Sequence, residues 1–105
     1  MSTHILVINP TLTFEQFRDK VKAGDIEGIS HAPSEQENKD SFCIVNEFQS
    51  HLWVCQDGKG DGFSFYRYGY QGIWTHTLRI LEDAGIIERF VDEHDDEYDE
   101  LMEEE

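Results

Sequence analysis

The chain has 105 residues, of which 23 are acidic and 8 are basic, so its formal net charge at pH 7 is −15. Its length suits one domain with one core, which two Trp, four Tyr and seven Phe side chains help to fill. The charge argues against direct binding of nucleic acid or of anionic membranes, because their phosphates would be repelled.

The first third of the chain predicts a strand, a helix and a loop. Residues 4–9 (HILVIN) form a short apolar run that is stopped by a proline, which is typical of a buried strand. Thr13 and Gln16 have the spacing of a capping box, and a helix is expected over residues 13–23. A further short strand can form near Ile26, before a polar loop.

The middle of the chain predicts strands. Three segments are rich in β-branched and aromatic residues, namely SFCIVNEF (41–48), HLWVCQ (51–56) and FSFYRYGY (63–70). If the first two fold back around Gln49, Cys43 and Cys55 become cross-strand neighbours. We expect both to be free thiols, because cysteines of cytosolic proteins are normally reduced.

The last third predicts a second helix and a final strand before an acidic tail. Residues 73–85 (IWTHTLRILEDAG) place apolar side chains on one helical face and finish with a glycine stop. Residues 86–93 (IIERFVDE) alternate as a strand. Residues 92–105 carry ten carboxylates and no Lys or Arg, and this tail can be helical because its apolar residues fall at i, i+3 and i+4.

The expected order is therefore β-α-β-β-β-α-β. We predict a single α+β domain over residues 1–91, with an antiparallel sheet of four to five strands and two helices on one face, ferredoxin-like or related. The acidic tail follows over residues 92–105. With no apolar run of about 18 residues and no signal-like N-terminus, a soluble cytoplasmic protein is expected.

The glycine-rich stretch CQDGKGDGFSFYRYG (55–69) allows more than one interpretation. As a calcium loop it has Lys59 and Tyr68 at ligand positions, and its flanks alternate like strands instead of forming helices. We favour a hairpin loop with an aromatic strand after it. Period-two alternation then places Tyr66 and Tyr68 on the open face of the sheet, where tyrosines are good interface residues.

The same strand also resembles the RNP1 segment of the RNA-recognition motif. The matching positions are Gly62, Phe63, Phe65 and Tyr68. The basic first position of that motif is Asp61 here, and its aliphatic position is Tyr66. RNA binding would also act against the net charge of the chain.

Catalytic and metal-binding signatures are missing from the sequence. The five histidines lack the i, i+4 spacing of a helical metal pair, and the two cysteines lack CxxC spacing. There is no GxSxG segment and no phosphate-binding loop. We therefore expect no enzyme, no cofactor and no metal.

The sequence best fits a small inhibitor that binds the basic surface of a nucleic-acid-binding protein or nuclease. In composition it resembles phage-encoded DNA mimics, anti-restriction proteins and anti-CRISPR proteins, and this resemblance implies a viral protein that acts in the host cytoplasm. Rigid carboxylates can take the positions of phosphates, and tyrosines can anchor the contact. The candidate partner-binding residues are Asp92, Glu93, Asp95, Asp96, Glu97, Asp99, Glu100, Tyr66, Tyr68, Tyr70 and Tyr98.

Two alternatives remain open at this point. The first is an immunity protein or antitoxin that neutralises one basic nuclease toxin, for which the physics of binding is the same. The second is a regulatory or scaffold domain whose tail only adds solubility. Removing the tail distinguishes this second alternative from the other two functions. A scaffold domain would still bind its partners without the tail, whereas an inhibitor or an immunity protein would lose them. The oligomeric state is open in all three cases.

Overall fold

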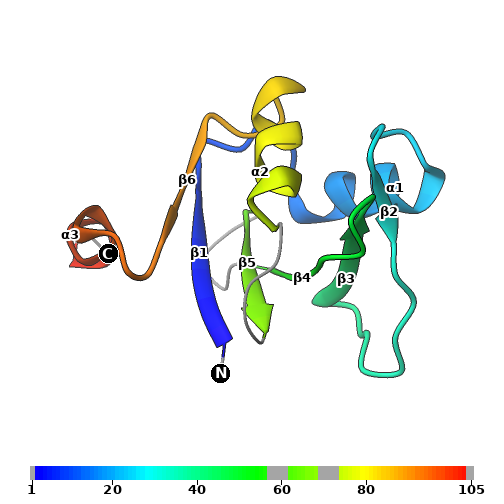
Figure 1. Cartoon of the computed structure of the whole chain (residues 1–105), viewed down its shortest axis with the longest axis horizontal. Helices are drawn as coiled ribbons and strands as arrows, with labels where there is room; N and C mark the ends of the chain where they lie inside the picture. The colour runs from blue at the N-terminus through cyan, green and yellow to red at the C-terminus, as the bar shows by residue number, and fades with distance from the viewer. Residues whose placement is uncertain (1, 57–61, 69–73, 104–105) are drawn as a thin grey trace.

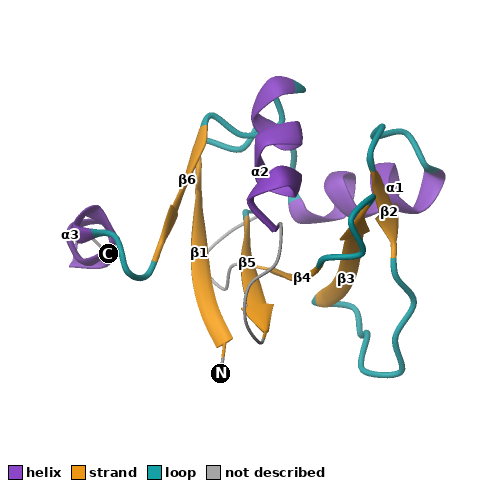
Figure 2. Ribbon diagram, viewed as in Figure 1, coloured by secondary structure: helices purple, strands orange, loops and turns teal. Residues whose placement is uncertain are grey.

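The computed structural model of the chain describes residues 2–56, 62–68 and 74–103 (Figures 1 and 2). These residues form a single compact α+β domain with six strands and three helices. In chain order the elements are β1 (Ser2–Ile8), α1 (Phe14–Ala23), β2 (Ile29–His31), β3 (Ser41–Asn46), β4 (His51–Gln56), β5 (Phe63–Tyr68), α2 (Trp74–Asp83), β6 (Arg89–Asp92) and α3 (Asp96–Glu103).

The strands form one antiparallel sheet in the order β2-β3-β4-β5-β1-β6. Strands β2 to β5 run as neighbours along the chain, and the N-terminal strand β1 lies between β5 and β6. Figure 1 shows α3 beyond β6, at the opposite end of the molecule from β2. The last strand therefore pairs with the first.

Local sequence signals set both ends of α1. Thr13 accepts a hydrogen bond from the backbone N–H of Gln16 at 3.1 Å, and the Gln16 side chain accepts one from the N–H of Thr13 at 3.0 Å. This reciprocal pair is the predicted capping box. Gly24 ends the helix with φ of 73°, a conformation that glycine adopts without steric cost.

The core lies between the sheet and the two helices α1 and α2. On α1 the buried residues are Phe14, Phe17 and Val21, and on α2 they are Thr77, Leu78 and Leu81. The ring of Phe17 stacks on that of Phe63 from β5, with centroids 4.7 Å apart and planes 2° from parallel. Apolar side chains from both helices and five strands form one cluster, which joins these helices to the sheet.

The sheet is larger than the four to five strands expected. The short strand predicted near Ile26 is present as β2, although it begins at Ile29. The last strand is shorter than predicted, because Ile86 and Ile87 are both buried in the core before β6 begins and do not alternate. After the end of α2 at Asp83, this apolar pair closes the end of the core.

The cysteine register was predicted wrongly. Cys43 lies opposite Trp53 in the β3–β4 ladder, whereas Cys55 lies opposite Ser41. The Asn46 side chain accepts hydrogen bonds from the backbone N–H groups of residues 48 and 50, which closes the turn one residue earlier than a bend centred on position 49. Both cysteines are free thiols, as expected.

The flanks of the glycine-rich stretch are strands. β4 and β5 pair antiparallel, with Gln56 opposite Phe63. An EF-hand needs a helix on each side of its loop, so these flanks disagree with a calcium loop. Residues 57–61, over which the hairpin loop is predicted, lie outside the described residues. None of the described helices combines the length and apolar character needed to cross a membrane.

Candidate functional site

The acidic segment at the C-terminus is folded because its own carboxylates bond its backbone. The Asp92 carboxylate accepts a hydrogen bond from the N–H of His94 at 2.8 Å, which turns the chain after β6. The Asp95 carboxylate accepts one from the N–H of Glu97 at 3.1 Å and so caps the start of α3. The first turn of α3 is also acidic, which the helix dipole favours.

Contacts to the sheet hold α3 in place. The Tyr98 hydroxyl lies 2.7 Å from His4 Nδ1, and the Glu93 carboxylate accepts a hydrogen bond from the backbone N–H of His4 at 3.1 Å. The guanidinium of Arg89 donates hydrogen bonds to both carboxylate oxygens of Glu97, and the distance from Nη1 to Oε1 is 2.7 Å. These contacts join the C-terminal segment to β1 and β6.

The ionisation of these groups favours the docked helix at neutral pH. The hydrogen bonds from Arg89 lower the pKa of Glu97, and those bonds raise the pKa of Arg89 in turn. Burial, followed by the negative charge of Glu93, raises the pKa of Tyr98. Glu97 is therefore ionised and Tyr98 protonated, which are the forms that their hydrogen bonds need.

The seven predicted carboxylates divide into two groups. Four of them bond the segment's own backbone or the sheet, namely Asp92, Glu93, Asp95 and Glu97. The other three, Asp96, Asp99 and Glu100, are exposed and fall at i, i+3 and i+4, on one face of α3. We call these three residues the acidic stripe.

Next to α3 runs a row of aromatic side chains on the sheet face that α1 and α2 do not cover, which we call the outer face. Strand register places Trp53 opposite Tyr66, and Tyr66 opposite His4. The rings of His4 and Tyr66 stack with centroids 4.6 Å apart, and Tyr98 meets His4 edge-on at 5.8 Å. These four residues are the aromatic row.

Two of the four predicted tyrosines therefore meet at one place. Tyr66 comes from β5 and Tyr98 from α3, and His4 lies between them. The side chain of Tyr68 and the whole of Tyr70 lie outside the described residues.

His4, Trp53 and Arg89 belong to the site but are not among the residues predicted from the sequence. The pairing register of β1, β4 and β5 identifies His4 and Trp53, because both lie opposite Tyr66 in the sheet. Arg89 is the cation nearest in sequence to the acidic tail, and that proximity was a usable signal.

At its other end the outer face is hollowed. A pocket of about 530 Å³ lies between residues 32–36 and strands β3 and β4, and Cys43, His51 and Trp53 contribute to its wall. Residues 32–36 form one wall of this pocket, and Glu37 fixes the end of that segment. Its Oε1 atom lies 2.5 Å from His31 Nε2, and its Oε2 atom lies 3.1 Å from Lys22 Nζ. The hydrogen bond with His31 lowers the pKa of Glu37, so the Glu37 carboxylate is ionised at neutral pH.

The two thiols are poor candidates for nucleophiles. Burial raises the pKa of Cys43 to about 11 and also raises the pKa of Cys55. Both are protonated at neutral pH, and the thiolate is the nucleophilic form. Within residues 2–56, 62–68 and 74–103, no three His, Cys, Asp or Glu side chains are placed to hold a metal ion.

Comparison with known proteins found no matching family model, no matching curated protein and no matching solved structure. Function is therefore inferred from the residues and their geometry. The most distinctive geometry is the acidic stripe beside the aromatic row.

Proposed function

We propose that this protein is a small acidic inhibitor that binds the basic surface of a nucleic-acid-handling protein, as DNA mimics of the anti-CRISPR or anti-restriction type do. The observation that carries the proposal is the docking of α3 on the sheet, with the acidic stripe facing solvent. Carboxylates can replace phosphates only where the backbone fixes their spacing, and α3 supplies such a backbone.

The geometry suits a basic partner. Neighbouring members of the acidic stripe have Cβ atoms about 5–6 Å apart, as residues at i, i+3 and i+4 of a helix do. The net charge of −15 steers a basic protein toward the molecule and raises the rate of association. The half-buried rings of Trp53, Tyr66 and Tyr98 offer apolar area beside the charges, and such anchors slow dissociation.

The test compares two variants with the same loss of charge. The first neutralises the acidic stripe with Asp96→Asn, Asp99→Asn and Glu100→Gln. The second neutralises three exposed carboxylates elsewhere, with Glu15→Gln, Asp19→Asn and Asp40→Asn. Wild type and both variants serve as baits in bacterial lysates, and the affinity of the captured protein is measured at low and high salt, with and without duplex DNA as competitor.

We expect wild type to capture a basic nucleic-acid-binding protein, in competition with the duplex. The stripe variant should bind this protein roughly tenfold to a hundredfold more weakly, because each lost charge pair contributes ~0.5–1 kcal/mol. The matched variant should bind almost as wild type does. Equal losses in both variants, or capture that is insensitive to salt, would contradict the proposal.

Two other results would point to the alternative functions. Capture of a single nuclease toxin, and of no other nucleic-acid-binding protein, would identify an immunity protein. Partners that are retained by the stripe variant at high salt would identify a scaffold domain, with α3 serving solubility alone.

We also propose that β1, β4, β5 and β6, with α1 and α2, form a ferredoxin-like arrangement that the β2–β3 pair extends at one edge. The support is the order β4-β5-β1-β6 within the sheet, together with the positions of α1 after β1 and α2 before β6. An experimental structure in which β1 lies outside the β5–β6 pair would contradict this arrangement.

A further inference from the structure

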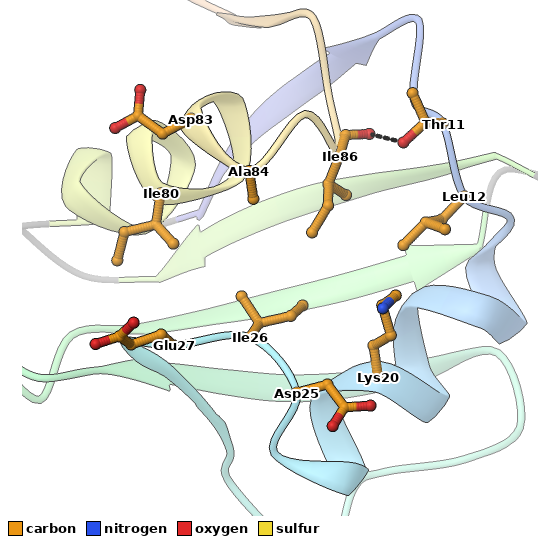
Figure 3. Close-up of a pocket in the computed structure, with 10 residues that line it drawn as sticks. All are labelled: Thr11, Leu12, Lys20, Asp25, Ile26, Glu27, Ile80, Asp83, Ala84 and Ile86. Atoms are coloured by element: carbon orange, nitrogen blue, oxygen red, sulfur yellow. Dashed lines mark hydrogen bonds between the residues drawn. The ribbon is translucent and has the colours of Figure 1, made fainter.

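A second cavity lies on the helical side of the molecule, away from the acidic stripe. It has a volume of about 600 Å³ and lies between the last turn of α2 and the segment that follows α1 (Figure 3). Its apolar floor consists of Leu12, Ile26, Ile80, Ala84 and Ile86. We call this cavity the interhelix pocket.

A glycine lets the wall of this pocket form. Gly28 has φ of 88°, and a Cβ added there would lie 2.9 Å from the Cδ1 atom of Ile80. The positive φ favours glycine at this position, and a larger residue would also require the Ile80 side chain to move. Ile26, two residues before Gly28, is almost fully buried at the base of the pocket.

The rim of the interhelix pocket is negative. The lining includes the exposed acidic residues Asp25, Glu27 and Asp83, and among the described lining residues Lys20 is the one cation (Figure 3). The formal charge of the lining is therefore −2. Figure 3 shows the apolar side chains and the amino group of Lys20 pointing into the space, whereas the carboxylates at its edge are directed outward.

The helix ends add to this negative potential. Both α1 and α2 finish beside the pocket, and the C-terminal end of a helix carries a partial negative charge. The last turn of α2 contains Glu82 and Asp83 and no basic residue, so two carboxylates stand where the helix dipole favours a cation. A bound cation would relieve this repulsion.

We propose that the interhelix pocket binds a lysine or arginine side chain of a basic partner protein. The aliphatic stem would lie on the apolar floor, and the cationic head would reach the carboxylates at the rim. Long basic side chains divide in this way between apolar and polar surroundings. That the occupant belongs to a partner protein rests on the proposed function. That the pocket prefers an aliphatic cation does not depend on it.

Three probes of equal chain length test the preference without the partner. n-Hexylammonium, n-hexanol and n-hexanoate are each titrated into the ¹⁵N-labelled full-length chain, and amide shifts are followed by NMR. We expect saturable shifts at Leu12, Ile26 and Ala84, with hexylammonium binding about threefold to tenfold more tightly than hexanol. Hexanoate should bind most weakly.

Variants locate the source of the preference. Glu27→Gln with Asp83→Asn should bring the affinity for hexylammonium down to that for hexanol, and the affinity for hexanol should stay unchanged. Glu15→Gln with Asp19→Asn removes the same charge from exposed positions outside the pocket and should leave both affinities unchanged. Ala84→Arg places a cationic side chain at the pocket, at an exposed position, and should abolish the shifts with little change in Tm.

Several results would overturn the proposal. These are equal binding of the three probes, shifts that do not converge on the pocket, or an equal loss in the matched charge variant. A dimer that Ala84→Arg dissociates would assign the pocket to a second copy of this chain instead. Because the probes need no partner, failure of the acidic-stripe experiment and failure of this one are distinguishable.

Discussion

The two faces of the sheet are built from alternate residues of the same strands, yet they differ in chemistry. The inner face packs under α1 and α2 and is almost wholly apolar, with Phe63 and Phe65 of β5 inside the core. The outer face carries Trp53 and Tyr66 from the intervening positions, and near it the acidic helix α3 contacts β6. Stability is thus concentrated on one face, and polar and aromatic groups are available for recognition on the other.

The largest expected effect of a substitution comes from the inner face. Phe17→Ala removes a ring that is 0% exposed and touches the rings of Phe42, Phe63 and Phe65, so we expect it to lower the free energy of unfolding by about 3–5 kcal/mol. Phe48→Ala is the matched control, because Phe48 is 50% exposed and should cost less than about 1 kcal/mol. Urea denaturation of both variants measures the difference, and similar costs would contradict the division between the faces.

A smaller effect is expected where α3 meets the sheet. Tyr98→Phe keeps the ring and removes the hydroxyl that bonds His4, which should cost about 0.5–1.5 kcal/mol. The loss should be local, so amide hydrogen exchange should speed up in α3 and stay unchanged in α1. Faster exchange throughout the chain, or none anywhere, would count against docking through this contact.

The smallest effect depends on pH. The folded pKa of Glu97 lies below its unfolded value, so the Arg89–Glu97 pair adds stability above the ordinary glutamate pKa of about 4.3 and loses it as pH falls through the lowered value. Glu97→Gln removes the pair at every pH. The difference in stability between wild type and this variant should therefore be constant near neutral pH and vanish in acid, as denaturation between about pH 2 and pH 7 would show. A difference that persists in acid would contradict the role given to this ion pair.

Those parts of the fold that depend on neighbouring residues were predictable from the sequence. The capping box of Thr13 and Gln16 and the stop at Gly24 belong to one helix, and both features are present as predicted. The register of β3 and β4 was not predictable in the same way. It depends on the Asn46 side chain, which closes the turn through two backbone N–H groups, and hydrophobic pattern does not reveal that choice.

The candidate site was predictable only in part, because it joins the two ends of the chain. Composition pointed to the acidic segment, but its docking depends on His4, which lies 94 positions from Tyr98 in the sequence. Sequence spacing also cannot divide the carboxylates into those that bond the backbone and those that face solvent. That division requires the positions of Arg89 and of the backbone N–H groups that the other carboxylates bond.

The proposed mimicry requires α3 to be a rigid platform for its carboxylates, which backbone ¹⁵N relaxation can test. We expect order parameters for residues 96–101 near the ~0.85 of rigid backbone, similar to those of β6. Values below about 0.6, with chemical shifts of a random coil, would mean that the acidic segment holds no fixed geometry. The proposed mimicry of phosphates by the acidic stripe would then be wrong.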